Sequence, residues 1–232
     1  MLEIVYEDNH LLVAVKPANM LSQADDTGDA DMLTVLKQYL KAKYQKPGNV
    51  YLGLVHRLDR PVGGLMVFAR TSKAASRLSR QLQEHEMGRS YLCVAEGRPK
   101  DSFTLVNYVK WSDPLNQMRI AEGVDPAAKE AVLHGKTISR MGDTALCAIT
   151  LETGRKHQIR VQMAAAGTPL WGDARYGRGI AGQAIALYGY RLIIEHPVTR
   201  QIMTFIRMPF GSIWAQYEEM LHTIARQEGA TP

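Results

Sequence analysis

Short apolar runs bounded by turn residues recur along the chain, which is the pattern of β-strands rather than of long helices. The strands that this pattern predicts span residues 3–6, 11–16, 51–55, 65–69, 90–96, 104–110, 129–139, 144–151, 184–195 and 201–206. Apolar residues recur at helical spacing after residue 31, from residue 72 to about 86, in a short stretch ending at Gly167, and from residue 212 to 226. We therefore expect many strands and few helices.

The order of these elements predicts the fold class. Because turns join most of the neighbouring strands, we expect an α+β fold with a mostly antiparallel mixed sheet, flanking helices and loops. The 232 residues, 46% of them apolar, suffice for one buried core, and no repeat of about 20–50 residues is present. We expect a single domain over residues 1–232, with a core at about 4–209 and a C-terminal helix at about 212–226.

The charge of the chain fits a polyanionic partner. The formal net charge is +5 and the pI is about 9.2. Several basic residues gather in a few segments rather than in a tail; they are Arg57, Arg60, Arg70, Arg155, Lys156, Arg160, Arg175, Arg178 and Arg191. If these segments meet in space, they line an electropositive surface that suits a nucleic acid.

Other features of the composition bear on compartment and metal binding. The apolar runs are too short to span a membrane, and the N-terminus enters a strand pattern without a basic leader, so we expect a cytoplasmic protein without a membrane partner. Cys93 and Cys147 lie in strand-like runs without CxxC spacing, which favours buried reduced thiols. The seven histidines show no HxH or HExxH spacing, so no metal site is expected.

A polar turn between the apolar runs 51–55 and 65–69 contains the strongest candidate for chemistry. Its carboxylate, Asp59, lies among one histidine and two arginines. Pro61 fixes a backbone angle and Gly63-Gly64 permits a positive φ, so the segment is expected to form a rigid turn that holds Asp59 still. Taken alone, the turn could equally be a hairpin loop whose aspartate pairs with its arginine neighbours.

Four ordered motifs carry a resemblance to a known family. Residues 56–59, His-Arg-Leu-Asp, followed by Gly64-Leu65, resemble the active-site motif of the RluA-type RNA pseudouridine synthases. Residues 89–92 resemble the basic-x-Tyr motif of that family, residues 151–162 its LxTGRxHQIR segment, and residues 167–177 its GHPIxGDxxYG segment. The resemblance covers the chain from about residue 4 to residue 209, and Lys16-Pro17 resembles the start of the family's KPxG segment.

The resemblance implies an enzyme that isomerises specific uridines in structured RNA, either ribosomal or transfer RNA, to pseudouridine. It implies that Asp59 is the nucleophile, that Arg160 forms a salt bridge with it, and that Tyr91 holds a base flipped out of the stack. The residues expected to contact the RNA are His56, Arg57, Arg60, Arg155, Lys156, His157 and Leu187. It also implies a pseudouridine-synthase-like fold around a central cleft, a monomer, no cofactor and no separate RNA-binding domain.

The chemistry needs one well-placed carboxylate. Converting uridine to its C-glycoside breaks a glycosidic bond, rotates the base and rejoins it at carbon, without redox change. The carboxylate can attack the sugar C1′ or promote deprotonation at C2′, and the residues leave both routes open.

Two other functions are open to such a chain. The first is a catalytically silent RNA-binding protein that uses the same basic residues. The second is a glycoside hydrolase or nucleosidase, which would need a second carboxylate where Asp59 has basic neighbours. The chain also departs from the family at residues 61–64, where x-Thr-Ser-Gly is usual, and at Tyr188-Gly189, where His-Ala is usual. Neither the RNA nor the uridine that is modified can be read from the sequence.

Overall fold

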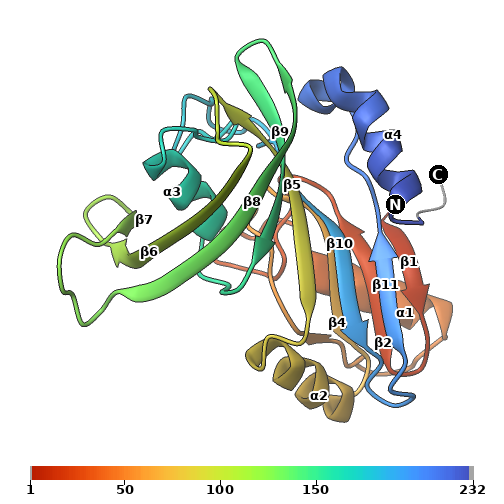
Figure 1. Ribbon diagram of the computed structural model, residues 1–232. Helices are drawn as coiled ribbons and strands as arrows, with labels where there is room; N and C mark the ends of the chain where they lie inside the picture. The colour runs from red at the N-terminus through yellow and green to blue at the C-terminus, as the bar shows by residue number, and fades with distance from the viewer. Residues whose placement is uncertain (1, 230–232) are drawn as a thin grey trace. The chain divides into compact units, whose positions relative to one another are not determined.

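The computed structural model describes residues 2–229, which divide into two units. The first unit contains the residues up to Gly88 together with Arg191–Arg207. The second contains Arg89–Tyr190 and the residues from Met208 onward. The chain returns to the first unit within β10 (Leu187–Glu195), drawn in blue in Figure 1. The segments predicted to carry the site are therefore divided between the two units.

Antiparallel strands form the sheet of the first unit. They are β1 (Glu3–Glu7), β2 (Leu11–Lys16), β3 (Gly53–Leu54) and β4 (Gly63–Ala69), with β1 paired to β2, and β2 and β3 each paired to β4. The end of β10 pairs with β11 (Ile202–Ile206) as an antiparallel hairpin. These strands confirm the predicted ones, except that the strand expected at 51–55 is only two residues long.

The near-continuous apolar sequences of β2 and β4 follow from their burial, since almost every residue of both strands is buried. On one face of the sheet, Leu11 and Val67 belong to a core cluster that also contains Leu78 from α2 and Leu192 from β10. This core fixes β4, and therefore the end of the loop that precedes it.

Side-chain caps start both helices of the first unit, α1 (Met32–Lys43) and α2 (Ser72–Gln83). The carboxylate of Asp31 accepts a hydrogen bond from the N–H of Thr34 at 2.9 Å. The hydroxyl of Thr71 accepts one from the N–H of Ala74 at 3.1 Å. Such caps satisfy N–H groups that the first helical turn leaves without a partner. The start predicted for α2 is confirmed, whereas the helix ends at Gln83 instead of near residue 86.

The second unit contains antiparallel strands that pair in the order β5-β9-β8-β6-β7. The strands are β5 (Gly88–Glu96), β6 (Ser102–Ser112), β7 (Gln117–Ile120), β8 (Lys129–Met141) and β9 (Thr144–Leu151). The sequence pattern did not predict β7, which has only four residues, two polar ones alternating with two apolar ones. Cys93 and Cys147 are buried opposite each other in β5 and β9, as their apolar surroundings predicted.

The helix α3 (Gln158–Ala165) packs against the β6–β7–β8 part of this sheet (Figure 1). Its Val161 belongs to a core cluster with Val109, Met118 and Ala131 from these three strands. The apolar spacing that ends at Gly167 places Ala166 on the inner face of the predicted helix, but this is wrong, because the helix ends at Ala165 and Ala166 is exposed. This packing places α3, and with it the segment that resembles LxTGRxHQIR, against the sheet.

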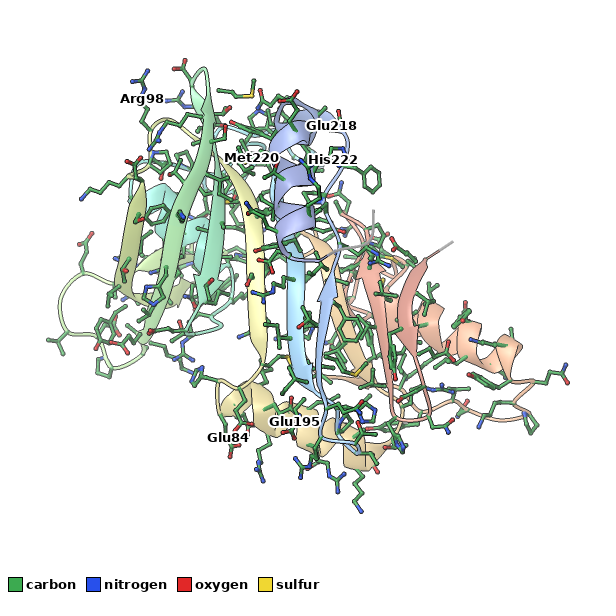
Figure 2. The ribbon with its side chains drawn as sticks, turned by 45° about the vertical axis from the view of Figure 1, so that its right-hand side comes forward. Glu84, Arg98, Glu195, Glu218, Met220 and His222 are labelled. Carbon is green, nitrogen blue, oxygen red and sulfur yellow. The ribbon has the colours of Figure 1, made fainter. Side chains whose placement is uncertain are left out.

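The C-terminal helix predicted at residues 212–226 divides into a 3₁₀ helix η1 (Ser212–Tyr217) and the helix α4 (Glu218–Gln227). Trp214, Tyr217 and Leu221, which recur at helical spacing in this stretch, are buried and therefore serve packing. On the exposed side of α4, Glu218 and His222 approach each other to 3.7 Å (Figure 2). Within residues 2–229, no helix is both long enough and apolar enough to cross a membrane.

Candidate active site

Asp59 lies in the loop that joins β3 to β4. The side chain of Leu58 before it is buried, while Asp59 itself is partly exposed. The N–H of Val62 donates to the carbonyl oxygen of Asp59 at 3.0 Å and closes a turn. Gly64 adopts a φ of +132°, a conformation that residues with a side chain rarely adopt. Both features agree with the predicted rigid turn after the aspartate.

The residue before Asp59 is fixed by a serine from the segment that follows β2. The hydroxyl of Ser22 donates to the carbonyl oxygen of Leu58 at 2.7 Å. The same hydroxyl oxygen accepts from the N–H of Leu58 at 3.1 Å. Ser22 therefore satisfies both backbone groups of the residue that precedes Asp59, and the bonds are buried.

The residue after Asp59 is fixed by Lys16, at the end of β2. The Lys16 ammonium donates to the carbonyl oxygens of Arg60 at 3.0 Å, Pro17 at 3.1 Å and Met20 at 2.5 Å. The lysine side chain is fully buried. An ammonium has three N–H donors, so these three carbonyls use its full donor capacity. Lys16 and Ser22 thus hold the backbone on both sides of Asp59.

The charge of Lys16 is sensitive to its surroundings. Burial lowers the pKa of Lys16 to about 7, while the negative charge of Asp59 raises it and the positive charge of Arg60 lowers it further. The lysine and the aspartate therefore interact electrostatically as well as through the loop backbone.

The other residues predicted in this loop have different environments. His56 is buried, and its Nε2 accepts from the N–H of Val67 at 3.2 Å, so it ties the loop to β4. Arg57 is exposed. Arg60 is about half exposed and pairs with Asp29 at 2.7 Å. Arg57 and Arg60 are accessible to a solute, while His56 contributes to packing.

The second unit holds the remaining predicted residues. Tyr91 is buried in β5, opposite Ile149 of β9. Leu187 is buried at the first position of β10. Both side chains are therefore held by regular sheet structure rather than by loops.

Arg160 is the most constrained of the predicted residues. It lies in α3 and is only 5% exposed. Its Nε donates to Asp173 Oδ2 and its Nη2 to Asp173 Oδ1, both at 2.9 Å, and the Asp173 side chain is fully buried. The guanidinium also lies 5.1 Å from the ring centroid of Tyr176. A two-point bond of this kind fixes the plane and the direction of the guanidinium.

Asp173 is an ionised carboxylate. Burial alone would raise its pKa, but the hydrogen bonds and the charge of Arg160 lower it below the ordinary value. The backbone N–H groups of Arg175 and Tyr176 donate to Asp173 Oδ1 at 2.9 and 3.1 Å and act in the same direction. The carboxylate therefore stays charged beside Arg160.

His157, the residue that directly precedes α3, has a left-handed backbone at φ +53°. Its Nδ1 lies 2.8 Å from the hydroxyl of Tyr176, which also accepts from the N–H of Met118 at 2.9 Å. Burial raises the pKa of Tyr176, so the hydroxyl keeps its proton and can donate it to the imidazole. The uncommon backbone of His157 is thus held by a side chain from the loop after α3.

Exposed basic residues precede α3. Arg155 is exposed, and its Nε donates to the carbonyl oxygen of Glu130 at 2.8 Å. The Lys156 ammonium lies 3.7 Å from the ring centroid of Trp111. Both side chains keep charge at the surface of the second unit, as their predicted role requires.

Four residues gain a place in the site from the structure alone. Lys16 and Asp173 lie in segments that resemble family motifs, yet the sequence assigned no contact to either, and Ser22 gave no signal. A lysine or an aspartate is normally exposed, so a motif position combined with a buried charge is the feature that would have revealed them. Tyr176, in the same segment as Asp173, is a comparable case.

The first unit thus holds a carboxylate restrained on both sides, and the second holds a buried arginine and exposed basic side chains of the kind that bind a polyanion. Residues 10–165, which take in both units, match the family model described as RNA pseudouridylate synthase. The chain belongs to this family and is therefore an isomerase that acts on RNA.

Two bacterial relatives illustrate the similarity in sequence. A ribosomal large subunit pseudouridine synthase D of Zymomonas mobilis is 34% identical in an alignment of 219 residues that covers 88% of this chain and 68% of that protein. An uncharacterized RNA pseudouridine synthase of Bacillus subtilis is 34% identical over 206 residues, covering 87% and 67% of the two chains.

The fold has a counterpart among solved structures. The human RNA pseudouridylate synthase domain containing 4 superimposes with a TM-score of 0.76 at 18% identity, over 95% of this chain and 93% of that chain. The predicted α+β fold, a single pseudouridine-synthase-like domain with a mixed sheet and few helices, is thereby confirmed.

Proposed function

We propose that this chain isomerises uridines of ribosomal RNA to pseudouridine, with the Asp59 carboxylate as the catalytic group. The observation that carries the proposal is the double restraint of the Asp59 loop, in which Ser22 binds Leu58 and Lys16 binds the carbonyl of Arg60. A carboxylate that forms a covalent bond or removes a proton gains from such restraint, because the reacting geometry is set before the substrate arrives.

The proposed reaction conserves every atom of the nucleotide. The carboxylate displaces the uracil from C1′, or promotes loss of a C2′ proton with the same departure of the base. The uracil then turns so that its C5 bonds to C1′, which breaks the carboxylate–C1′ bond on the first route and is accompanied by return of the proton to C2′ on the second. The C5 hydrogen leaves as a proton, and N1 gains a proton, so the product is an isomer of the substrate.

The remaining predicted residues keep the roles that the family resemblance assigns to them. Arg160 holds Asp59 ionised and oriented, and Tyr91 stacks on the uracil. Arg57 fills the gap that the flipped base leaves, since extrusion costs a few kcal/mol of stacking. The RNA strand is bound by the side chains of Arg60, Arg155, Lys156 and His157, and the buried side chains of His56 and Leu187 shape the substrate site from beneath.

Ribosomal RNA is the proposed substrate because relatives such as the Zymomonas mobilis protein are named as ribosomal large subunit pseudouridine synthases. Transfer RNA is the other substrate that the resemblance allows. The proposed enzyme works in the cytoplasm as a monomer.

The test compares RNA from cells that lack the gene with RNA from wild-type cells by pseudouridine mapping. The proposal predicts that one or a few ribosomal pseudouridines disappear and return when the wild-type gene is restored. A gene for the variant Asp59→Asn should not restore them, while Asp26→Asn, an exposed aspartate of the same unit, should.

Three outcomes would contradict parts of the proposal. Loss of pseudouridine from transfer RNA alone would show that the substrate is transfer RNA and not ribosomal RNA. Restoration of the pseudouridines by the Asp59→Asn gene would show that the Asp59 carboxylate is not the catalytic group. A purified protein that binds ribosomal RNA tightly while no pseudouridine depends on it would be a catalytically silent RNA-binding protein.

A further inference from the structure

We propose that Asp173 and Tyr176 are positioning residues that hold the guanidinium of Arg160 in a single orientation. The inference deepens the proposed function and rests on it, because it assigns Arg160 the task of orienting the catalytic carboxylate. Both residues come from the loop after α3, in the segment that resembles GHPIxGDxxYG.

Asp173 has almost no freedom to move. Its Oδ1 accepts from the N–H groups of Arg175 and Tyr176 as well as from Arg160 Nη2, while Oδ2 accepts from Arg160 Nε. Its backbone carbonyl oxygen accepts from the N–H of Gly177 at 2.9 Å. A guanidinium bound at two points by such a carboxylate has one direction available to it.

The loop that carries Asp173 is folded too tightly for side chains at two glycines. Gly172 has a φ of +78°, and a Cβ there would lie 2.6 Å from the carbonyl oxygen of Ala184. A Cβ on Gly179 would lie 2.2 Å from the backbone of Gly172. Since backbone atoms cannot yield as a flexible side chain can, this loop has a single shape, and Asp173 keeps its place within it.

Tyr176 restrains Arg160 from a second direction. Its ring centroid lies 5.1 Å from the guanidinium carbon, and its hydroxyl is bound to the N–H of Met118 in β7 and to His157 Nδ1. The ring therefore cannot swing away from Arg160 without breaking two hydrogen bonds. Stability alone is a weak reason for this arrangement, because a buried ion pair is often no more stabilising than apolar side chains of the same volume.

What the arrangement does provide is direction. Asp173 binds one edge of the guanidinium. The ion pair therefore fixes the direction of the remaining N–H donors of Arg160. A second carboxylate can be bound through those donors, because a guanidinium carries five of them. A lysine cannot reproduce the geometry, since its ammonium has no fixed plane.

The test uses the full chain and a ribosomal RNA substrate on which the wild type has been shown to form pseudouridine. Asp173→Asn should lower the single-turnover rate at saturating enzyme by about 100-fold, the scale expected for a misplaced catalytic group. The RNA dissociation constant should stay within about threefold of the wild-type value. This is smaller than the tenfold change that corresponds to about 1.4 kcal/mol of binding free energy. Asp101→Asn, which removes the exposed partner of Arg140, should react like the wild type.

The pH profile separates positioning from a merely structural role. A loosely held Arg160 favours the ionised Asp59 less, so the acid limb of the rate should move to higher pH in Asp173→Asn by about one unit. A variant that is only less stable would lose rate by a common factor at every pH. Tyr176→Leu, which removes the ring, should move the acid limb of the rate in the same direction. This variant replaces Asp173→Asn in the test if Asp173→Asn does not fold.

An independent measurement observes Arg160 directly. In protein labelled with ¹⁵N-arginine, the Arg160 Nε–H resonance, identified by its loss in Arg160→Lys, should exchange slowly with water in the wild type. Asp173→Asn and Tyr176→Leu should speed this exchange by at least about tenfold, since the bond to Asp173 protects the proton.

If both variants show the turnover rate, the acid limb and the Nε–H exchange rate of the wild type, the inference is overturned while the proposed function stands. A common fall in rate at every pH with unchanged exchange would also overturn it. A wild type that forms no pseudouridine on any ribosomal RNA would instead overturn the proposed function, and the exchange measurement would still report whether Asp173 and Tyr176 restrain Arg160.

Discussion

The ammonium of Lys16 lies 3.0 Å from the carbonyl oxygen of Arg60, the residue that directly follows Asp59. The bond joins the end of β2 to the candidate catalytic loop across 44 residues of sequence. Because the lysine is fully buried, the loop cannot move away from β2 without leaving the Arg60 carbonyl without its donor and the buried ammonium without one of its three acceptors.

Lys16→Met should therefore destabilise the protein and slow the enzyme. Methionine fills a similar volume but leaves the three carbonyls without their donor, so we expect a loss of about 2–4 kcal/mol in the free energy of unfolding. Turnover should fall while RNA affinity changes little, because the lysine contacts only the loop backbone. Denaturant unfolding and single-turnover kinetics measure the two effects. Lys73→Met, at an exposed position of α2, is the control, and equal behaviour of the two variants would refute the role of Lys16.

The depressed pKa of Lys16 predicts a pH dependence of stability. With a folded pKa of about 7 against 10.5 for the free side chain, the folded state binds fewer protons than the unfolded state between these values. The free energy of unfolding of the wild type, minus that of Lys16→Met, should rise with pH in this window, by up to about 1.4 kcal/mol per pH unit. It should be flat below about pH 6. A difference that is constant from pH 6 to 10, or that falls, would show that Lys16 keeps an ordinary pKa.

Arg160→Ala should be strongly destabilising, because it leaves the carboxylate of Asp173 buried without its partner. Breaking a buried pair costs about 3–5 kcal/mol. Arg140→Ala, which removes a pair with the largely exposed Asp101, should cost about 0–1 kcal/mol. Thermal and denaturant unfolding compare the two variants. Losses of similar size would mean that the burial of the Arg160–Asp173 pair has no energetic weight.

The proposed pairing of Arg160 with Asp59 predicts coupling between them. Arg160→Lys should cut turnover severely, since lysine cannot bind a carboxylate at two points. The double variant Asp59→Asn with Arg160→Ala should be less destabilised than the sum of the single variants, because one unpaired charge is removed. A double-mutant cycle of unfolding free energies measures the coupling. Additive losses with near-normal activity of Arg160→Lys would show that the two residues do not meet.

The exposed basic residues predict that RNA binding weakens with salt. The logarithm of the binding constant should fall linearly with the logarithm of salt between about 50 and 200 mM, because bound cations are released from the phosphates. Arg155→Ala or Lys156→Ala should each reduce the slope by about one without abolishing the chemistry. Arg98→Ala, at an exposed arginine outside these segments (Figure 2), should leave the slope unchanged. A slope of zero in the wild type would exclude a phosphate-binding surface.

Much of the fold could be predicted from the sequence because the relevant signals are local. The apolar runs of β2 and β4 and the caps Thr71 and Asp31 act within a few residues of the elements they define. The strand β7 was missed because its four residues pair with β6 without an apolar run of their own.

The site was predicted less completely, because its restraints join distant segments. Motif order pointed to Asp59, Arg160 and Tyr91. The bond from Lys16 to the loop and the carboxylate pair of Arg160 with Asp173 depend on burial that only the folded chain creates. In the sequence, a buried lysine and an exposed lysine look the same.

The most direct test of the role of Asp59 follows the hydrogen that the reaction must expel. Ribosomal RNA labelled with tritium at C5 of its uridines should release tritium to water when the wild-type protein forms the bond between C5 and C1′. Asp59→Asn should fold, bind the RNA with near wild-type affinity and release tritium more than about a thousandfold slower, as expected on removal of the catalytic carboxylate. Release at the wild-type rate by Asp59→Asn would contradict the central claim.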